Sequence, residues 1–147
     1  MKQTRSDNRG FSLVELIIVV ALMVTLVAVL APQFAKYVRK ANDAVIESSA
    51  QNVFTVAKVE FIAGNLTLDG ERGTITVGVP GGTGNIEAEL SNNLHYSDAA
   101  DPTLSFNTVC GITANRRLNT DKSYIITIEM DGAVPRFSMA ESDSDSD

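Results

Sequence analysis

Residues 11–31 have the sequence FSLVELIIVVALMVTLVAVLA, in which only Ser12, Glu15 and Thr25 are polar. An α-helix rises about 1.5 Å per residue, so this stretch would span roughly 31 Å. The hydrocarbon core of a bilayer is about 30 Å thick, and a helix pairs all the backbone groups that lipid leaves without water. The stretch therefore predicts one transmembrane helix.

A secretory signal peptide that is removed on export is the alternative interpretation. Such a signal needs small residues before the cut, and Val29 and Ala31 could serve. Pro32 would then stand directly after the cut, where proline is unfavourable. Because the apolar run also continues straight into a helical pattern, a retained segment fits better.

Glu15 is the one acidic residue in the apolar run. A carboxylate costs a few kcal/mol at the middle of a membrane and less near the interface. In one interpretation it snorkels or is protonated near the headgroups; in the other it awaits a cation. The run contains no Lys or Arg, so that cation would come from a neighbouring chain or from an amine made by cutting the backbone.

Residues 9–15 have the sequence RGFSLVE, after a short basic leader and before the apolar run. Over about the first 45 residues, this arrangement resembles the class III leader and N-terminus of type IV pilins and pseudopilins. The resemblance implies that a prepilin peptidase cuts between Gly10 and Phe11 on the cytoplasmic side and N-methylates Phe11. It also places Glu15 where the family has its glutamate, and Pro32 where many pilins have a proline.

The resemblance further implies that Glu15 pairs with the amino terminus of an adjacent subunit during assembly. Cleavage would free an amine at Phe11, four residues before the acid. Pairing within one chain, about one helical turn away, is the other possibility. Between chains the pair would set the register of the subunits, because a wrong offset leaves a desolvated charge unpaired.

The implied partners are a prepilin peptidase and identical or related pilin subunits in a helical filament, with a pilus assembly ATPase and an inner-membrane platform acting indirectly. The chain would be a single-pass membrane precursor with a cytoplasmic N-terminus, then part of an extracellular pilus. Basic residues flank both sides of the run, so charge decides the orientation only weakly. A pseudopilin of a type II secretion or competence (DNA-uptake) system is the alternative. A non-polymerising membrane-anchored binding module is the alternative of another class.

Residues 33–63 predict a helix that continues the first and ends at Gly64-Asn65, a C-cap pattern. Pro32 is expected to kink the helix or melt it locally. Two apolar stripes indicate two partners, the chain's own head and neighbouring subunits, although one broad buried face is the alternative. One stripe comprises Phe34, Val38, Ala41, Val45, Val56 and Val59, and the other Ile46, Ala50, Val53, Ala57 and Phe61.

The remaining sequence predicts a small β-rich head and an α+β fold, with the long N-terminal helix packed on a small antiparallel sheet of three or four strands, as in pilins. Asp131-Gly132 predicts a hairpin with a type I′ turn. Asn85 is expected to cap a short helix over residues 85–93, and residues 78–84 to form a loop. Strands are predicted over residues 74–79, 104–110, 124–130 and 134–139.

The expected organisation follows from these segments. Residues 1–10 are the cleaved leader, 11–31 the transmembrane and assembly helix, 32–64 its amphipathic continuation, and 65–140 the head. Residues 141–147 (ESDSDSD) form an acidic tail that is expected to be disordered, because it has no apolar side chains to bury.

Composition excludes several kinds of chemistry. A net charge of -6 gives no indication of specific nucleic-acid binding. The lone Cys110 rules out an internal disulfide and multi-cysteine zinc sites, and we expect it to be a buried small hydrophobe. Residues 81–84 (GGTG) lack the lysine of a phosphate-binding loop. No nucleophile–base pair is evident, so we predict no enzyme, no catalytic residues, no cofactor and no metal site.

Overall fold

The computed structural model describes residues 12–97, 102–112 and 117–142. The chain divides into two compact units, Met1–Val38 and Arg39–Asp147, which are described separately below. Both contain part of α1, a helix that extends over Leu13–Ala63.

Helix α1 ends as its sequence predicts. Gly64 adopts the left-handed conformation with φ +82°, which glycine reaches without steric cost. The Gly64 N–H donates to the Phe61 carbonyl (3.2 Å) and the Asn65 N–H to the Glu60 carbonyl (3.0 Å). These two bonds form a Schellman motif, which satisfies carbonyls that the end of a helix leaves unpaired.

Pro32 lies inside α1, and the helix continues through it without a break, so the expected local melting is not found, while the kink expected at Pro32 stays a prediction. Proline in a helix removes one hydrogen bond and costs about 3 kcal/mol. Ending one helix there and starting another would leave about four N–H and four carbonyl groups unpaired. Continuing the helix therefore leaves fewer unpaired backbone groups.

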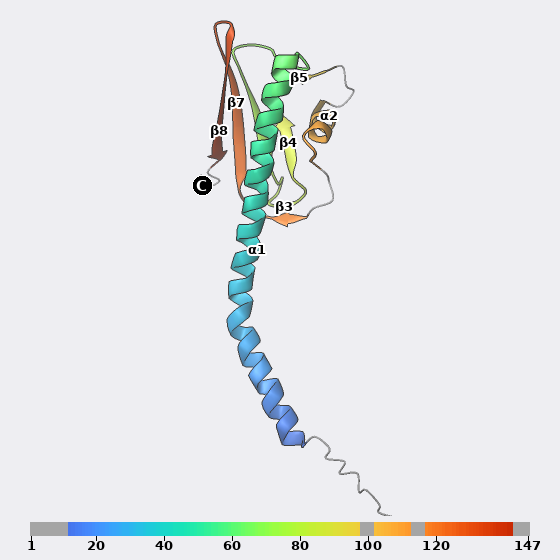
Figure 1. Cartoon of the computed structure of the whole chain (residues 1–147), viewed down its shortest axis with the longest axis vertical. Coiled ribbons are helices and arrows are strands. Elements are labelled where there is room, and N and C mark those ends of the chain that lie inside the picture. Colours follow the sequence, from blue (N-terminus) through green and yellow to red (C-terminus); the bar gives the residue numbers. More distant parts are fainter. Residues whose placement is uncertain (1–11, 98–101, 113–116, 143–147) are drawn as a thin grey trace, which may run out of the picture. The chain divides into compact units, whose positions relative to one another are not determined.

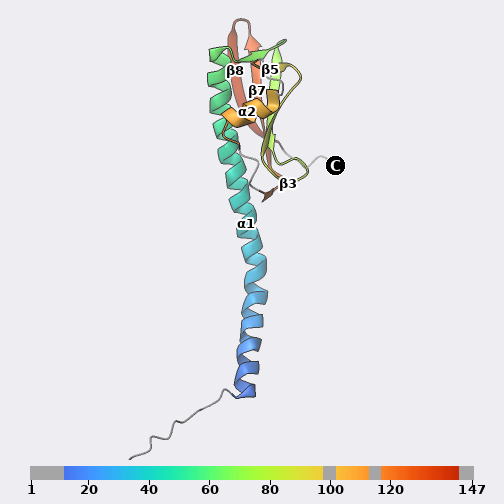
Figure 2. The same cartoon turned by 90° about the vertical axis from the view of Figure 1, so that its right-hand side faces the viewer.

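The second unit contains one four-stranded antiparallel sheet in the order β4-β2-β7-β8 and two small ladders, β1-β5 and β3-β6. The later part of α1 lies along one face of the sheet (Figures 1 and 2). The elements after α1 are β1 (Leu66–Leu68), β2 (Arg72–Gly78), β3 (Thr83–Gly84), β4 (Glu87–Leu90), β5 (Leu94–Tyr96), α2 (Pro102–Val109), β6 (Leu118–Asn119), β7 (Ser123–Asp131) and β8 (Val134–Ser142).

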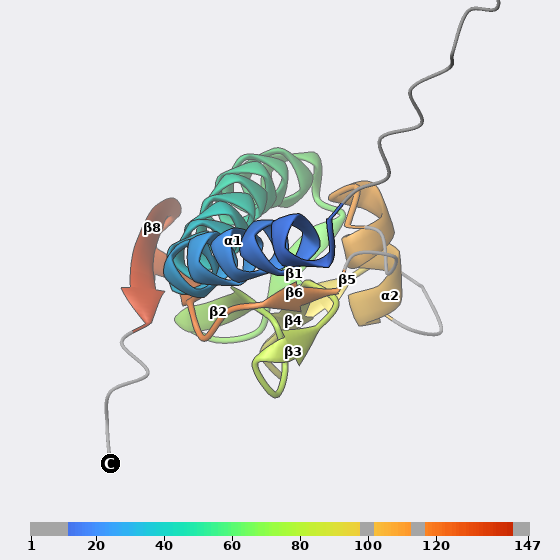
Figure 3. The same ribbon diagram turned by 90° about the horizontal axis from the view of Figure 1, so that it is seen from below.

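The two edges of the main sheet differ. Helix α2 contacts β4 and lies beside it in the view from below (Figure 3). Its Asn107 Oδ1 accepts a hydrogen bond from the Ala88 N–H of β4 (2.8 Å). Strand β8 forms the opposite edge and pairs only with β7 in the sheet order.

One of the two predicted apolar stripes forms the core of the second unit. Its first four residues are fully buried, together with alternate residues of β2 and β7. The other stripe is only partly covered: Phe34, Val38 and Val59 are 70%, 42% and 58% exposed, whereas Val45 and Val56 are half-buried against the core. The burial is therefore uneven, deep along the first stripe and partial along the second. The core includes Ile46, Ala50, Val53, Ala57, Ile75, Val77, Ile126 and Ile128.

Two predicted elements are wrong in type. Residues 104–110, predicted as a strand, belong largely to helix α2. Pro102 at its first position has a φ that suits a helix start, and the fully buried Phe106 anchors it against the Tyr96 ring. Residues 85–93, predicted as a helix, contain β4 instead. There, buried Ala88 alternates with exposed Glu87 and Glu89, the period of a strand with one covered face.

The remaining strand predictions are confirmed with shifted ends. The β7-β8 hairpin forms, but Asp131 pairs with Val134, so the loop is Gly132-Ala133. Only Gly132 has a positive φ (+65°), which fits a type II′ turn rather than type I′. Strand β8 also extends to Ser142, into the segment predicted as a disordered tail, where Glu141 forms an ion pair with Lys122. Residues 143–147 lie outside the described residues.

The burial pattern predicts different costs for two valines of α1. Val53→Ala should lower the free energy of unfolding by about 1–3 kcal/mol, because it leaves a cavity between α1 and the sheet. Val59→Ala, at a 58% exposed position, should be neutral or slightly stabilising, since alanine favours helices. Thermal unfolding of the full chain in detergent measures both, and equal shifts would contradict the assigned core face.

Candidate assembly site on the N-terminal helix

Glu15 lies in the first turn of α1. The backbone N–H groups of Glu15 and Leu16 donate to the carbonyl of Ser12 (3.0 and 3.2 Å), the residue just before the helix. Ser-x-x-Glu is the spacing of a capping box, and an acid in the first turn also interacts favourably with the helix dipole. The prediction from sequence did not assign Glu15 a role in capping the helix. The Ser-x-x-Glu spacing of residues 12–15 indicates that role.

The Glu15 carboxylate is exposed and has no cationic partner among the residues that the structure describes. The next Lys or Arg along α1 is Lys36, 21 residues later, which is roughly 31 Å along a helix. Gly10 and Phe11, the predicted cleavage and methylation residues, lie outside the described residues. The Glu15 carboxylate thus has apolar neighbours, and a cation that pairs with it would come from outside the described residues.

The first part of α1 exposes a continuous apolar surface. From Leu13 to Leu30 every large hydrophobic side chain is between 43% and 73% exposed, and none of the apolar window is buried within the chain. By length and composition α1 could cross a membrane. An apolar surface of this extent is not stable in water and needs lipid or protein to cover it.

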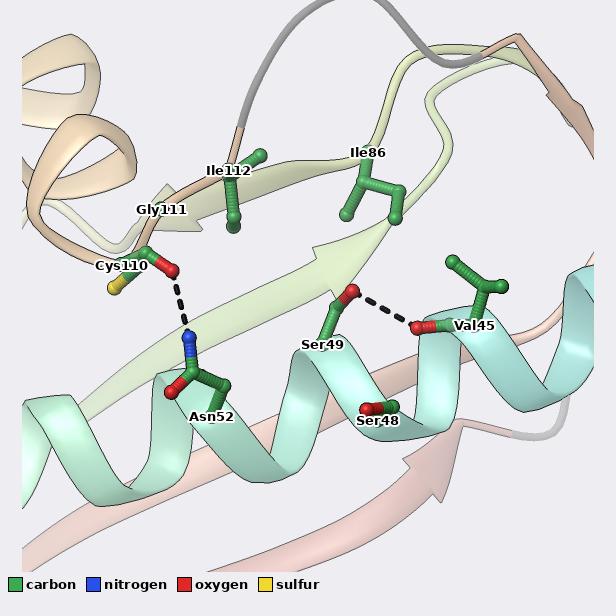
Figure 4. Close-up of a pocket in the computed structure, with 8 residues that line it drawn as sticks. All are labelled: Val45, Ser48, Ser49, Asn52, Ile86, Cys110, Gly111 and Ile112. Carbon is green, nitrogen blue, oxygen red and sulfur yellow. Dashed lines mark hydrogen bonds between the residues drawn. The ribbon is translucent and has the colours of Figure 1, made fainter.

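A surface hollow of about 400 Å³ lies between α1 and the segment after α2 (Figure 4). The Asn52 side-chain N–H donates to the Cys110 carbonyl (2.7 Å), and the Ser49 hydroxyl donates to the Val45 carbonyl (2.8 Å). Both side chains thus bond to backbone carbonyls of the fold. In the described residues no group of three His, Cys, Asp or Glu side chains could hold a metal ion.

Cys110 is buried, as predicted, although it follows a helix and does not lie in a strand. Burial raises the pKa of its thiol from 9.0 to about 12, and the negative charge of Glu60 adds to the shift. A raised pKa means that the folded state favours the neutral thiol. The stability that this thiol contributes is therefore constant below pH 9 and is lost as the pH rises from 9 towards 12.

Because the thiolate is the reactive form, Cys110 should resist alkylation in the folded chain. At pH 9 we expect iodoacetamide to label it more slowly than in denaturant by roughly two to three orders of magnitude. A cysteine placed at the exposed Thr55 in a Cys110→Ala background should react at the rate of a free thiol. Equal rates for the two cysteines would show that Cys110 is not shielded.

A comparison with family models identifies a known motif at the N-terminus. Residues 5–31 match the model described as the prokaryotic N-terminal methylation motif, which is the class III leader of type IV pilins and prepilins. The match includes Gly10, Phe11 and Glu15 and extends to the end of the apolar run. No curated protein and no solved structure gives a significant match. The α+β arrangement of a long N-terminal helix and antiparallel sheets is consistent with the pilin fold.

Proposed function

We propose that this chain, which carries the class III leader of prepilins, is a structural subunit of a type IV pilus. It is made as a membrane precursor, cut between Gly10 and Phe11 by a prepilin peptidase, methylated at Phe11, and polymerised through α1. One observation supports this above all. The methylation motif is joined to an apolar helix surface that the described residues leave uncovered, and lipid covers it in the precursor as other subunits do in the filament.

Glu15 gives the assembly its register. Cleavage frees an ammonium group at Phe11, and this group on an incoming subunit is the cationic partner that the Glu15 carboxylate does not have among the described residues of its own chain. Surrounded by apolar side chains, either charge left alone would be strongly destabilising. Subunits therefore pack only at the offset that joins the two charges.

The apolar stripe of α1 that contains Phe34, Val38 and Val59 favours a polymer over a membrane-anchored monomer. Phe34 and Val38 follow the membrane-spanning run, and Val59 lies further along the same helix. All three are exposed in the single chain. A lone anchored module gains nothing from apolar side chains in water, whereas a subunit buries them against its neighbours.

A pseudopilin of a type II secretion or competence system would use the same motif and the same helix. The two candidates differ in the length of the polymer, because a pilus is long enough to be sheared from the cell surface.

Processing is tested by the mass of the protein in sheared filaments. The wild-type chain should begin at Phe11 and carry the extra mass of one methyl group. Gly10→Val should keep the leader and stay in the membrane fraction, because a β-branched side chain obstructs the close approach that glycine allows. Asn8→Ala, at the third residue before the cut, should be processed normally. A wild-type filament protein that retains its first ten residues would contradict the proposal.

The charge of Glu15 can be separated from its role at the start of the helix. Glu15→Gln keeps the hydrogen-bonding groups of a capping box and removes the charge. We expect normal cleavage but at least about a tenfold loss of sheared filaments, because the buried ammonium of Phe11 loses its partner. Glu15→Asp should retain part of the yield, and Glu47→Gln, at an exposed position of the same helix, should retain all of it. Normal filaments from Glu15→Gln would show that the charge does not set the register.

A further inference from the structure

Residues 65–67 have the sequence Asn-Leu-Thr. The chain has ten asparagines, and Asn65 alone is followed two residues later by a serine or threonine. Asn-x-Ser/Thr, with any residue but proline in the middle, is the acceptor pattern for N-linked glycosylation. The pattern is short, so the argument depends on how the fold presents it.

The fold exposes both defining residues of the pattern, the acceptor Asn65 and Thr67, whose hydroxyl donates to the His95 carbonyl (3.3 Å). Asn65 and Thr67 are exposed, whereas Leu66 between them is buried with 1% of its surface accessible. Leu66 starts β1, and side chains alternate between the two faces of a strand. Leu66 thus anchors the tripeptide to the core while its neighbours face outwards.

The backbone around Asn65 is held from both sides. Its N–H donates to the Glu60 carbonyl in the cap of α1, and its carbonyl accepts a hydrogen bond from the Ser97 N–H (2.7 Å). The side-chain amide donates to Glu60 Oε2 (2.9 Å). That amide nitrogen carries two hydrogens, so a bond to Glu60 can persist after one of them is replaced by a sugar.

A polar hollow of about 360 Å³ adjoins the acceptor and is lined by Gly64, Asn65, Thr67, His95 and Ser97. A side chain at Gly64 would meet no atom within 4 Å, so this side of the hollow is open. Imidazole and hydroxyl groups bond readily to sugar hydroxyls. The surface next to Asn65 can therefore seat the first sugar ring.

The site also lies at one end of the part of α1 that belongs to the second unit. Asn65 follows the last turn of α1, and the part of this helix in the second unit begins at Arg39. Twenty-five helical residues span roughly 37 Å. A glycan on Asn65 would leave the opposite end of this helix segment free for packing.

We propose that Asn65 is an N-glycosylation site. Asn65 Nδ2 forms a bond to the anomeric carbon of a sugar carried on a polyprenyl diphosphate. The bond from that carbon to the diphosphate oxygen breaks, the lipid diphosphate leaves, and the amide loses one proton. This inference rests on the proposed function, because the head must reach the outer side of the membrane, where a membrane-bound transferase meets it.

Mass spectrometry of the chain purified from the cells that make it tests the site. Trypsin cuts after Lys58 and Arg72 and releases residues 59–72, in which Asn65 is the only asparagine. We expect a sugar mass on Asn65 in more than half of the wild-type peptide. Asn65→Gln and Thr67→Ala should lower it below a tenth, whereas Thr67→Ser should retain it because serine keeps the hydroxyl.

Asn92→Gln is the matched control, since Asn92 is exposed but outside any acceptor pattern. It should leave the sugar on Asn65 unchanged. An unmodified wild-type peptide would overturn the inference, as would a sugar that survives in Asn65→Gln or Thr67→Ala.

The N-terminus of the same sample separates this inference from the proposed function. A methylated Phe11 together with bare Asn65 would overturn the glycosylation site alone. A retained leader would overturn the processing, whatever the state of Asn65.

Discussion

The apolar surface of α1 that the described part of the chain leaves uncovered is the feature on which the proposed role depends. The second unit buries the stripe from Ile46 to Ala57 against its own sheet, whereas the large hydrophobic side chains from Leu13 to Leu30 remain exposed among the residues that the structure describes. Each Å² of apolar surface kept from water is worth about 25 cal/mol. The helix therefore needs lipid or another protein surface to cover it, and Glu15 matters because it is the one charged residue between Leu13 and Leu30.

The parts of the fold that depend on local chemistry could be predicted from the sequence. The cap at Gly64-Asn65 and the β7-β8 hairpin need only a few neighbouring residues, and both formed. The strand predicted over residues 104–110 failed because the contact of Phe106 with Tyr96, ten residues earlier in the chain, decides its structure. A short apolar run suits a helix or a strand equally well, and tertiary packing makes the choice.

The candidate site could be predicted only in part. Glu15 was identified from the leader pattern, and the family model confirms that pattern. Its place in the first turn of α1, with Ser12 as the cap, required the helix boundary. The two stripes of α1 were visible in the sequence, but periodicity cannot tell which stripe the head covers. The structure shows that Val53 faces the sheet and Val59 faces solvent.

The two edges of the main sheet differ, and this difference limits how copies of the head can associate by strand pairing. Growth of a sheet from chain to chain needs two free edges on every molecule. Here α2 contacts β4 and Asn107 accepts the Ala88 N–H at that edge, which disfavours pairing of a second chain with β4. Within the main sheet β8 is the more open edge, so an added strand would extend the sheet on one side rather than on both.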